Sequence, residues 1–331
     1  MFQEPRVYFH TGNRTLTSGG DEASVQAMTL TYTPYDGSSP LFTIGLLPLD
    51  PERWIEPDGE LGFHLAEKRR LLAEHGEKIL CAEPGTENGQ REVLERLTEY
   101  VTTRHPEIYR RNGNVMTMAG QSVDLADETM LPIHRAGLLV QDDLVIMKQG
   151  ENGWRLAAGF LAFPSSWKLS DKFGKVMDEV HAPVPGFEGG SRNAQLINRM
   201  FDRLQPGNPV RRMNWSVNWR HALYHPVSMP AAEVSKVPPQ NSVIRIERQT
   251  LTKLPVSGDI LFTIRIYLDP VAAILSEPDG EKLALSMADQ LEALSLEEAN
   301  YKGLKEKRAE LVSHLRCPQT VHQKQQKTLA E

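Results

Sequence analysis

Apolar positions recur at helical spacing in two segments of the first third of the chain, Leu61–His75 and Gln90–His105. Both segments are predicted to be helices. The second carries an apolar stripe on a charged background, made of Val93, Leu94, Leu97, Tyr100 and Val101. Ahead of them, Leu41–Trp54 is apolar but contains two prolines. That composition favours an anchoring segment over a regular element.

The pattern changes near Ala136, where short apolar runs typical of strands begin. The expected elements are, in order, strand material at 138–146, a turn at 151–153, a strand at 154–163, helices at 171–181 and 193–204, and strands at 210–219, 242–254 and 260–268. An antiparallel sheet with helices inserted between its second and third strands is an α+β arrangement. It is also the strand–helix order of a PAS domain.

This order divides the chain into four expected regions. They are a loosely ordered N-terminal extension at 1–38, a helical N-terminal region packing on the core at 39–135, a PAS-like core at 136–275, and a C-terminal helical tail at 276–331. Within the tail, Met287–Leu315 is predicted to be a charged amphipathic helix, and residues 319–331 to be frayed.

Composition narrows the class of protein. The 331 residues are 40% apolar and 24% charged, which excludes general disorder and a small disulfide scaffold. The formal charge of −6 argues against a dedicated nucleic-acid binder. The longest apolar run, Leu41–Leu49, is far shorter than the ~20 residues that cross a bilayer, and no secretory signal is visible. Cys81 and Cys317, without a CxxC, fit a reducing compartment, so a cytoplasmic location is expected.

His181 is the most informative candidate for a functional residue. It lies at the end of the predicted helix 171–181, on the same stripe as Phe173, Val176, Met177 and Val180. An imidazole that faces a core from a helix end could offer a nitrogen to a heme iron. Spacing alone favours the ordinary alternatives, a core histidine bonded to a carbonyl or an imidazolium stabilised by the helix C-terminus.

Three other groups of residues have both a functional and an ordinary explanation. His221 and His225 have the i, i+4 spacing of zinc ligands, but Ala222 replaces the glutamate of an HExxH site, and His134 is a weaker candidate. Period-2 alternation puts Arg245, Glu247 and Gln249 on one strand face and Arg248 on the other, with Arg265 across the turn. They form either a wall for a cationic substrate or a solvated face. Trp215 beside Asn214 is either a cofactor wall or core packing.

The usual nucleotide and hydrolase motifs are missing from the sequence. It contains no GxGxxG, GxxxxGK[ST] or GxSxG. Dinucleotide-binding, P-loop and ordinary serine-hydrolase functions therefore lack their main support.

Several strings together resemble one family, the alpha subunit of heme-dependent oxidative N-demethylase. They are Phe163-Pro164-Ser165-Ser166-Trp167, Lys172-Phe173-Gly174, Val180-His181-Ala182-Pro183-Val184-Pro185-Gly186, Arg212-x-Asn214-Trp215, Ile244-Arg245-x-Glu247-Arg248-Gln249-Thr250-Leu251-x-x-Leu254-Pro255 and Phe262-Thr263-Ile264-Arg265. The similarity runs from about Leu41 to Leu275, which leaves out residues 1–38 and the tail after about 287. Asp142 departs from the pattern, which leads us to expect glutamate there.

The resemblance implies an activity and its cofactors. Members of the family carry heme b in a PAS-like core and use dioxygen to oxidise a secondary methylamine, such as dimethylamine, to a primary amine and formaldehyde. Electrons come from NADPH through a separate flavin and iron–sulfur reductase subunit, and a folate-binding subunit can take up formaldehyde. The implied class is a cytoplasmic heme monooxygenase subunit.

The resemblance also implies roles for particular residues. His181 becomes the expected proximal ligand of the heme iron, with Arg212, Asn214 and Trp215 beside the cofactor. Glu247 is expected to bind the substrate ammonium, because an unpaired buried charge is costly. Arg245, Arg248 or Arg265 is expected to polarise the oxygen ligand. A non-catalytic heme-binding PAS-like sensor and a zinc enzyme remain the alternatives.

Overall fold

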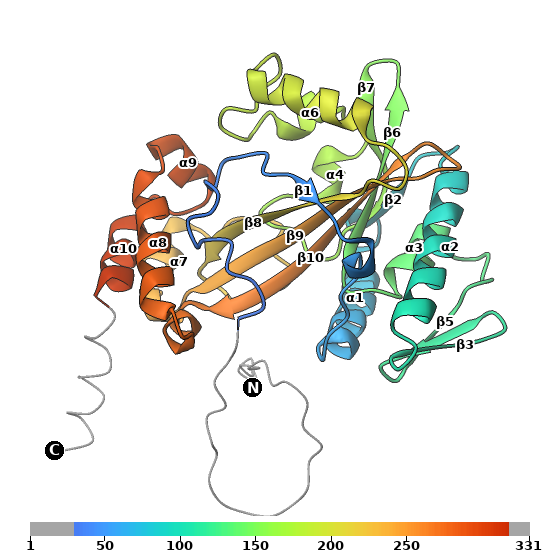
Figure 1. Ribbon diagram of the computed structural model, residues 1–331, viewed down its shortest axis with the longest axis horizontal. Helices are drawn as coiled ribbons and strands as arrows, with labels where there is room; N and C mark the ends of the chain where they lie inside the picture. The colour runs from blue at the N-terminus through green and yellow to red at the C-terminus, as the bar shows by residue number, and fades with distance from the viewer. Residues whose placement is uncertain (1–29, 318–331) are drawn as a thin grey trace, which may run out of the picture.

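A seven-stranded sheet forms the centre of the computed structural model, which describes residues 30–317 (Figure 1). The strand order is β1-β8-β9-β10-β6-β7-β2, and every neighbouring pair is antiparallel. The strands are β1 (Leu47–Pro48), β2 (Leu80–Ala82), β6 (Asp143–Gly150), β7 (Gly153–Phe160), β8 (Val210–Asn218), β9 (Val243–Lys253) and β10 (Ile260–Pro270). The predicted α+β class with a large antiparallel sheet is confirmed.

The first third of the chain covers one end of this sheet. It contains α1 (Leu61–His75), α2 (Glu87–Arg104), α3 (Pro132–Gly137), and a small sheet of β3 (Tyr109–Asn112), β4 (Val115–Met118) and β5 (Gln121–Asp124). Short 3-10 turns lie at Pro51–Arg53 and Gly76–Lys78. Both predicted helices are confirmed. The small sheet was not predicted, because its four-residue strands are too short to show alternation.

One predicted strand begins later than expected. Residues 138–140 are not extended, because the backbone there curls around the ammonium group of Lys68. Its Nζ donates hydrogen bonds to the carbonyls of Gly137, Val140 and Asp142 at 3.1, 3.0 and 2.5 Å. β6 therefore starts at Asp143 and forms the predicted hairpin with β7.

The helix predicted at 171–181 is broken in two, α4 (Leu169–Lys172) and α5 (Met177–His181). Gly174 adopts a positive φ of 77° between them, and its N–H donates to the carbonyl of Leu156 in β7. This backbone pairing with the sheet competes with the helix, so Phe173 and Val176 do not share a helix with His181. The following helix, α6 (Arg192–Arg203), is as predicted.

The C-terminal region forms three helices, not the single one predicted. They are α8 (Gly280–Ala293), α9 (Leu296–Tyr301) and α10 (Arg308–Arg316), and a 3-10 turn at Val271–Ser276 precedes them. The short helix α7 (Ala231–Val234) and a 3-10 turn at Pro239–Asn241 lie earlier, between β8 and β9. A new helix begins after Ser295, whose hydroxyl caps the N–H of Glu298 while the carboxylate of Glu298 accepts the N–H of Ser295. The predicted fraying at 319–331 lies outside the described residues.

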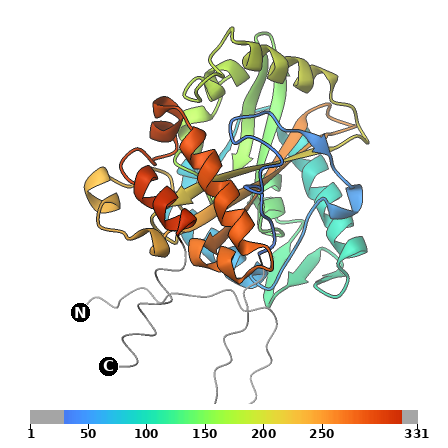
Figure 2. The same cartoon turned by 60° about the vertical axis from the view of Figure 1, so that its left-hand side comes forward.

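These helices cover one face of the sheet together with residues 30–41 (Figure 2). Tyr35 is fully buried and packs edge-on against Trp215. Part of the segment expected to be loosely packed is thus core, because its apolar side chains fill the space between sheet and helices. Residues 1–29 lie outside the described residues.

The opposite face of the sheet is covered by α4, α5 and α6, which lie in the connection between β7 and β8 (Figure 1). The five long strands are, in chain order, β6, β7, β8, β9 and β10. The helices α4–α6 follow the second of them, β7, in the order that the sequence predicts. Within residues 30–317, no helix combines the length and the apolar character that crossing a bilayer requires.

Candidate functional site

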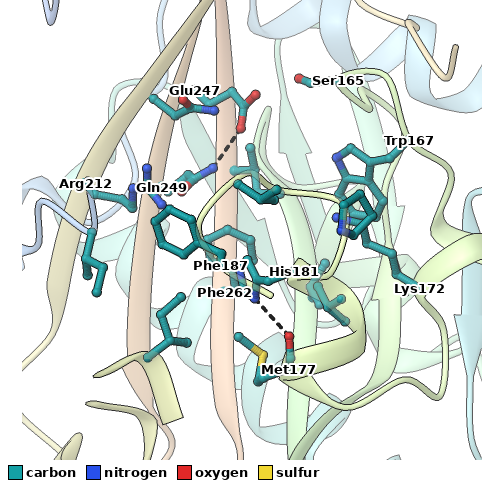
Figure 3. Close-up of a pocket in the computed structure, with 18 of the residues that line it drawn as sticks. Ser165, Trp167, Lys172, Met177, His181, Phe187, Arg212, Glu247, Gln249 and Phe262 are labelled. Carbon is teal, nitrogen blue, oxygen red and sulfur yellow. Dashed lines mark hydrogen bonds between the residues drawn. The ribbon is translucent and has the colours of Figure 1, made fainter. Parts of the chain in front are cut away.

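A cavity of about 600 Å³ lies between α4–α6 and the sheet (Figure 3). That volume is within the range of small-molecule and cofactor sites. Its apolar wall is made of Val145, Met147, Leu156, Leu251, Phe262 and Ile264 from the sheet, and of Phe187, Ile197, Met200 and Phe201 from the helical side. Residues 41–44 and Leu46 close a further side.

His181 lines this cavity as the last residue of α5. Its Nδ1 is 3.0 Å from the carbonyl oxygen of Met177 (Figure 3). A carbonyl only accepts, so Nδ1 carries the hydrogen and the Nε2 of the neutral ring keeps its lone pair. Burial, helped by the nearby cations Lys172 and Arg212, lowers the pKa of His181 to about 4. The ring is neutral at pH 7 and could ligate a metal.

A polar strip of the sheet faces the same cavity. The register pairs Arg212 of β8 with Gln249 of β9, and Asn214 with Glu247, so all four side chains share one face. The amide of Gln249 donates to Glu247 Oε2 at 2.7 Å and fixes that carboxylate in the wall. Glu247, only 8% exposed, is therefore placed to pair with a cation inside the cavity.

Several wall residues were not predicted from the sequence. Lys302 Nζ donates to Asn214 Oδ1 and to the carbonyl of Trp215, and burial lowers its pKa to about 8. Lys172 stacks over Trp167 at 4.4 Å, and burial likewise lowers its pKa to about 8. No local sequence pattern identifies Lys302 as a wall residue, because it lies in the region predicted to be a charged amphipathic helix, Met287–Leu315.

The three arginines expected to face the oxygen ligand do not line the cavity. Arg245 is fully buried and donates to five oxygens, those of Phe163, Pro164, Ser165, Ala222 and Leu223. Arg248 binds the carbonyls of Arg53 and Trp54 and the carboxylate of Glu56, and Arg265 binds Asp58 and His64. Their guanidinium groups hold loops and α1 against the sheet, which corrects the expectation.

Trp215 is also absent from the cavity wall, because alternation along β8 turns it to the opposite face. There it packs in the core beneath the C-terminal helices. His221 and His225 are not on a helix, and His225 forms an isolated bridge with Ser165. Among residues 30–317, no group of three His, Cys, Asp or Glu side chains could hold a metal ion.

The fold and the site define a class: an α+β protein with a mainly apolar cavity whose wall presents one neutral imidazole and several half-buried cations. Residues 45–312 match the family described as "Haem-dependent oxidative N-demethylase, alpha subunit-like". The chain belongs to this family. The match includes α8, α9 and part of α10, so the tail expected to lie outside the resemblance is part of the family fold.

The residues of the cavity fit the heme that the family name implies. Apolar side chains suit a flat macrocycle, and His181 offers an unprotonated nitrogen for the iron. Arg212 contributes a buried Nε for which the structure shows no hydrogen-bond partner. This donor set could hold a cofactor that is apolar at its centre and anionic at its edge.

Proposed function

We propose that this chain is a heme-dependent oxidative N-demethylase subunit that acts on a small secondary amine such as dimethylamine. Heme b would occupy the cavity between the sheet and α4–α6, and His181 would hold its iron. The observation that carries the proposal is the bond from His181 Nδ1 to the carbonyl of Met177, which leaves Nε2 as the ligating atom.

The chain's own residues would bind, orient and shield the reactants, while bound heme supplies the activation of dioxygen. Burial keeps His181 neutral, so no proton has to leave before ligation. The apolar side chains around the cavity exclude water from the reacting methyl group. Among the expected site residues, Asn214 and Arg212 also line the cavity and would lie beside the cofactor.

Glu247 is the proposed partner of the substrate ammonium. Its carboxylate is buried, and its hydrogen bond from Gln249 uses Oε2, which leaves Oε1 for the amine. The carboxylate would hold the nitrogen and accept its proton. Dioxygen, a pair of electrons and two protons convert one N-methyl group to a carbinolamine and release water. The carbinolamine then breaks its C–N bond to give formaldehyde and the primary amine.

Electrons would come from a second protein. The two cysteines, Cys81 and Cys317, are too few for an iron–sulfur cluster, and the sequence has no dinucleotide fingerprint. We propose that NADPH reduces the site through a separate flavin and iron–sulfur reductase, with a folate-binding subunit as acceptor of formaldehyde. The succession of two strands, three helices and three strands, with the short α7 and a 3-10 turn between β8 and β9, supports a PAS-like core.

The test is the absorption spectrum of the heme-loaded protein, recorded with and without dimethylamine and again after reduction. We expect a Soret band that shifts with amine, and formaldehyde once a surrogate reductase is added. His181→Ala should abolish tight heme binding, whereas the control His225→Ala should retain it. Glu247→Gln should bind heme normally but require a far higher amine concentration for the shift.

Three outcomes would refute the proposal in different ways. A Soret band that responds to gases but to no methylamine, without formaldehyde, would identify a heme sensor instead. Unchanged heme binding in His181→Ala would show that another residue ligates the iron. Absence of any Soret band would refute the heme assignment itself.

A further inference from the structure

We propose that Arg212, together with Lys302, forms a carboxylate-binding subsite on the sheet wall of the cavity. The inference rests on the proposed function, because the carboxylate belongs either to a propionate of the heme or to the substrate. In the second case the substrate class would be N-methyl amino acids rather than simple amines.

Arg212 differs from the other buried arginines of the sheet. Arg245, Arg248 and Arg265 each bind several protein oxygens. For Arg212, no hydrogen bond and no ion pair is found within residues 30–317, and its Nε is buried without a partner. Burial lowers the pKa of this arginine, yet a guanidinium stays charged at neutral pH. A largely buried guanidinium that makes no hydrogen bond and no ion pair is unfavourable, so a further partner is expected.

Among residues 30–317, no neighbour of Arg212 forms a hydrogen bond or an ion pair with its side chain. The charge of Glu247, which lies diagonally across in the register, opposes the lowering of the Arg212 pKa, but its carboxylate is hydrogen-bonded to Gln249. Lys302 adds a second cation, which is half-buried, and its ammonium donates to the neutral oxygens of Asn214 and Trp215. Two cations thus stand against one carboxylate at this part of the wall. One further negative charge would balance the site.

The chemistry of these groups selects a carboxylate. The planar guanidinium fork matches the two oxygens of a carboxylate, and the lysine adds a point charge beside it. The rest of the wall is largely apolar, which suits an organic acid. Both sources, a heme propionate and the carboxylate of an amino acid, have this chemistry, so the experiment must separate them.

The experiment compares wild type, Arg212→Gln, Arg212→Lys and the control Arg211→Gln. Arg211 is the neighbour on β8 that alternation directs away from the cavity, and it is not part of the wall. Each protein is titrated with heme and with heme dimethyl ester, and binding is followed by quenching of tryptophan fluorescence. Each heme-loaded protein is then titrated with dimethylamine and with N-methylglycine, and the Soret shift is followed.

The two sources predict different results. If Arg212 holds a propionate, wild type should prefer heme over its diester by about 10- to 100-fold, the worth of a charged hydrogen bond, and Arg212→Gln should lose that preference. If Arg212 holds the substrate, the diester should bind as well as heme. In that case Arg212→Gln should weaken only N-methylglycine, by a similar factor, with dimethylamine unchanged. Arg212→Lys should retain part of either effect, and Arg211→Gln should behave as wild type.

The inference is refuted if Arg212→Gln and wild type bind all four ligands equally. Should Arg212→Gln fail to fold, Lys302→Met provides the same comparison, with the same outcomes supporting or refuting the site. A wild-type chain that binds no heme refutes the proposed function and the inference together. The two failures are therefore distinguishable.

Discussion

Replacing Lys68 by methionine should destabilise the protein strongly, because the ammonium group is fully buried and has a hydrogen-bond acceptor for each of its three hydrogens. It donates to three carbonyls and lies 3.8 Å from Asp143 Oδ1. Methionine keeps much of the volume but removes all three donors and the charge. Three hydrogen bonds are lost at ~1 kcal/mol each, and a carboxylate is left without its cation. We expect the free energy of unfolding to fall by about 3–5 kcal/mol. In a thermal melt this corresponds to roughly 6–20 °C.

The loss should also depend on pH. Burial raises the pKa of Asp143 above its ordinary value, and the Lys68 ammonium opposes that rise. Without the ammonium, the pKa of Asp143 in the folded state climbs further above its value in the unfolded state. A group with a raised folded pKa stabilises the fold at low pH and loses that contribution as pH rises through the folded pKa. The deficit of Lys68→Met should therefore grow from pH 5 to pH 7.5, by at most ~1.4 kcal/mol per pH unit.

Urea denaturation at both pH values measures this free energy of unfolding. The matched control is Lys307→Met, which breaks an ion pair with a half-exposed carboxylate, Glu310, and should cost less than about 1 kcal/mol. Lys68→Met combined with Asp143→Asn should recover part of the loss, because no charge is then left unpaired. A loss in Lys68→Met equal to that of the control, with no dependence on pH, would refute the reasoning.

Substitutions at three further positions test the packing around the sheet by urea denaturation. Tyr35→Phe should leave the free energy of unfolding almost unchanged, because the buried hydroxyl has no hydrogen-bond partner. Tyr35→Ala should lower it by about 3–5 kcal/mol. Equal effects of the two substitutions would contradict this. Gly137→Ala should lower the free energy of unfolding by about 1–3 kcal/mol, because the added Cβ would lie 2.3 Å from the buried ring of Phe160. Gly59→Ala serves as the control, since the space around Gly59 is open. Arg245→Lys should cost roughly 1–3 kcal/mol and speed amide exchange at 163–167, because lysine cannot reach five acceptors; unchanged exchange there would count against its role.

The local sequence pattern was sufficient to predict the elements whose apolar positions recur regularly. The helix Leu61–His75, which has one buried face, was predicted close to its true bounds. So was β9, where apolar and charged residues alternate over 244–247 although both faces of the strand are buried. The pattern failed where the backbone has a competing partner. Gly174 pairs with β7 and breaks the predicted helix, and residues 138–140 curl around Lys68. Such competition depends on residues far away in the sequence.

The candidate site shows the same division. His181, Glu247, Arg212 and Asn214 do line one cavity, as expected from the resemblance and from alternation. The arginines could not be assigned from sequence, because a guanidinium on a strand can face a ligand or bind loop carbonyls with equal ease. Arg245 shows this best, since it shares the strand face of Glu247 and is nevertheless saturated by loop oxygens.

The wall of the cavity combines residues 41–46 with Tyr301 and Lys302, and in between it draws on β6 to β10. Phe42 stacks edge-on with Tyr301, so segments more than 250 residues apart meet at this one place. Contacts of such long range form late in folding, because the loop that they close must first be ordered. During synthesis on the ribosome, the wall cannot be complete before Lys302 has emerged. A ligand that needs the complete wall can therefore be held only when nearly the whole fold has been synthesised.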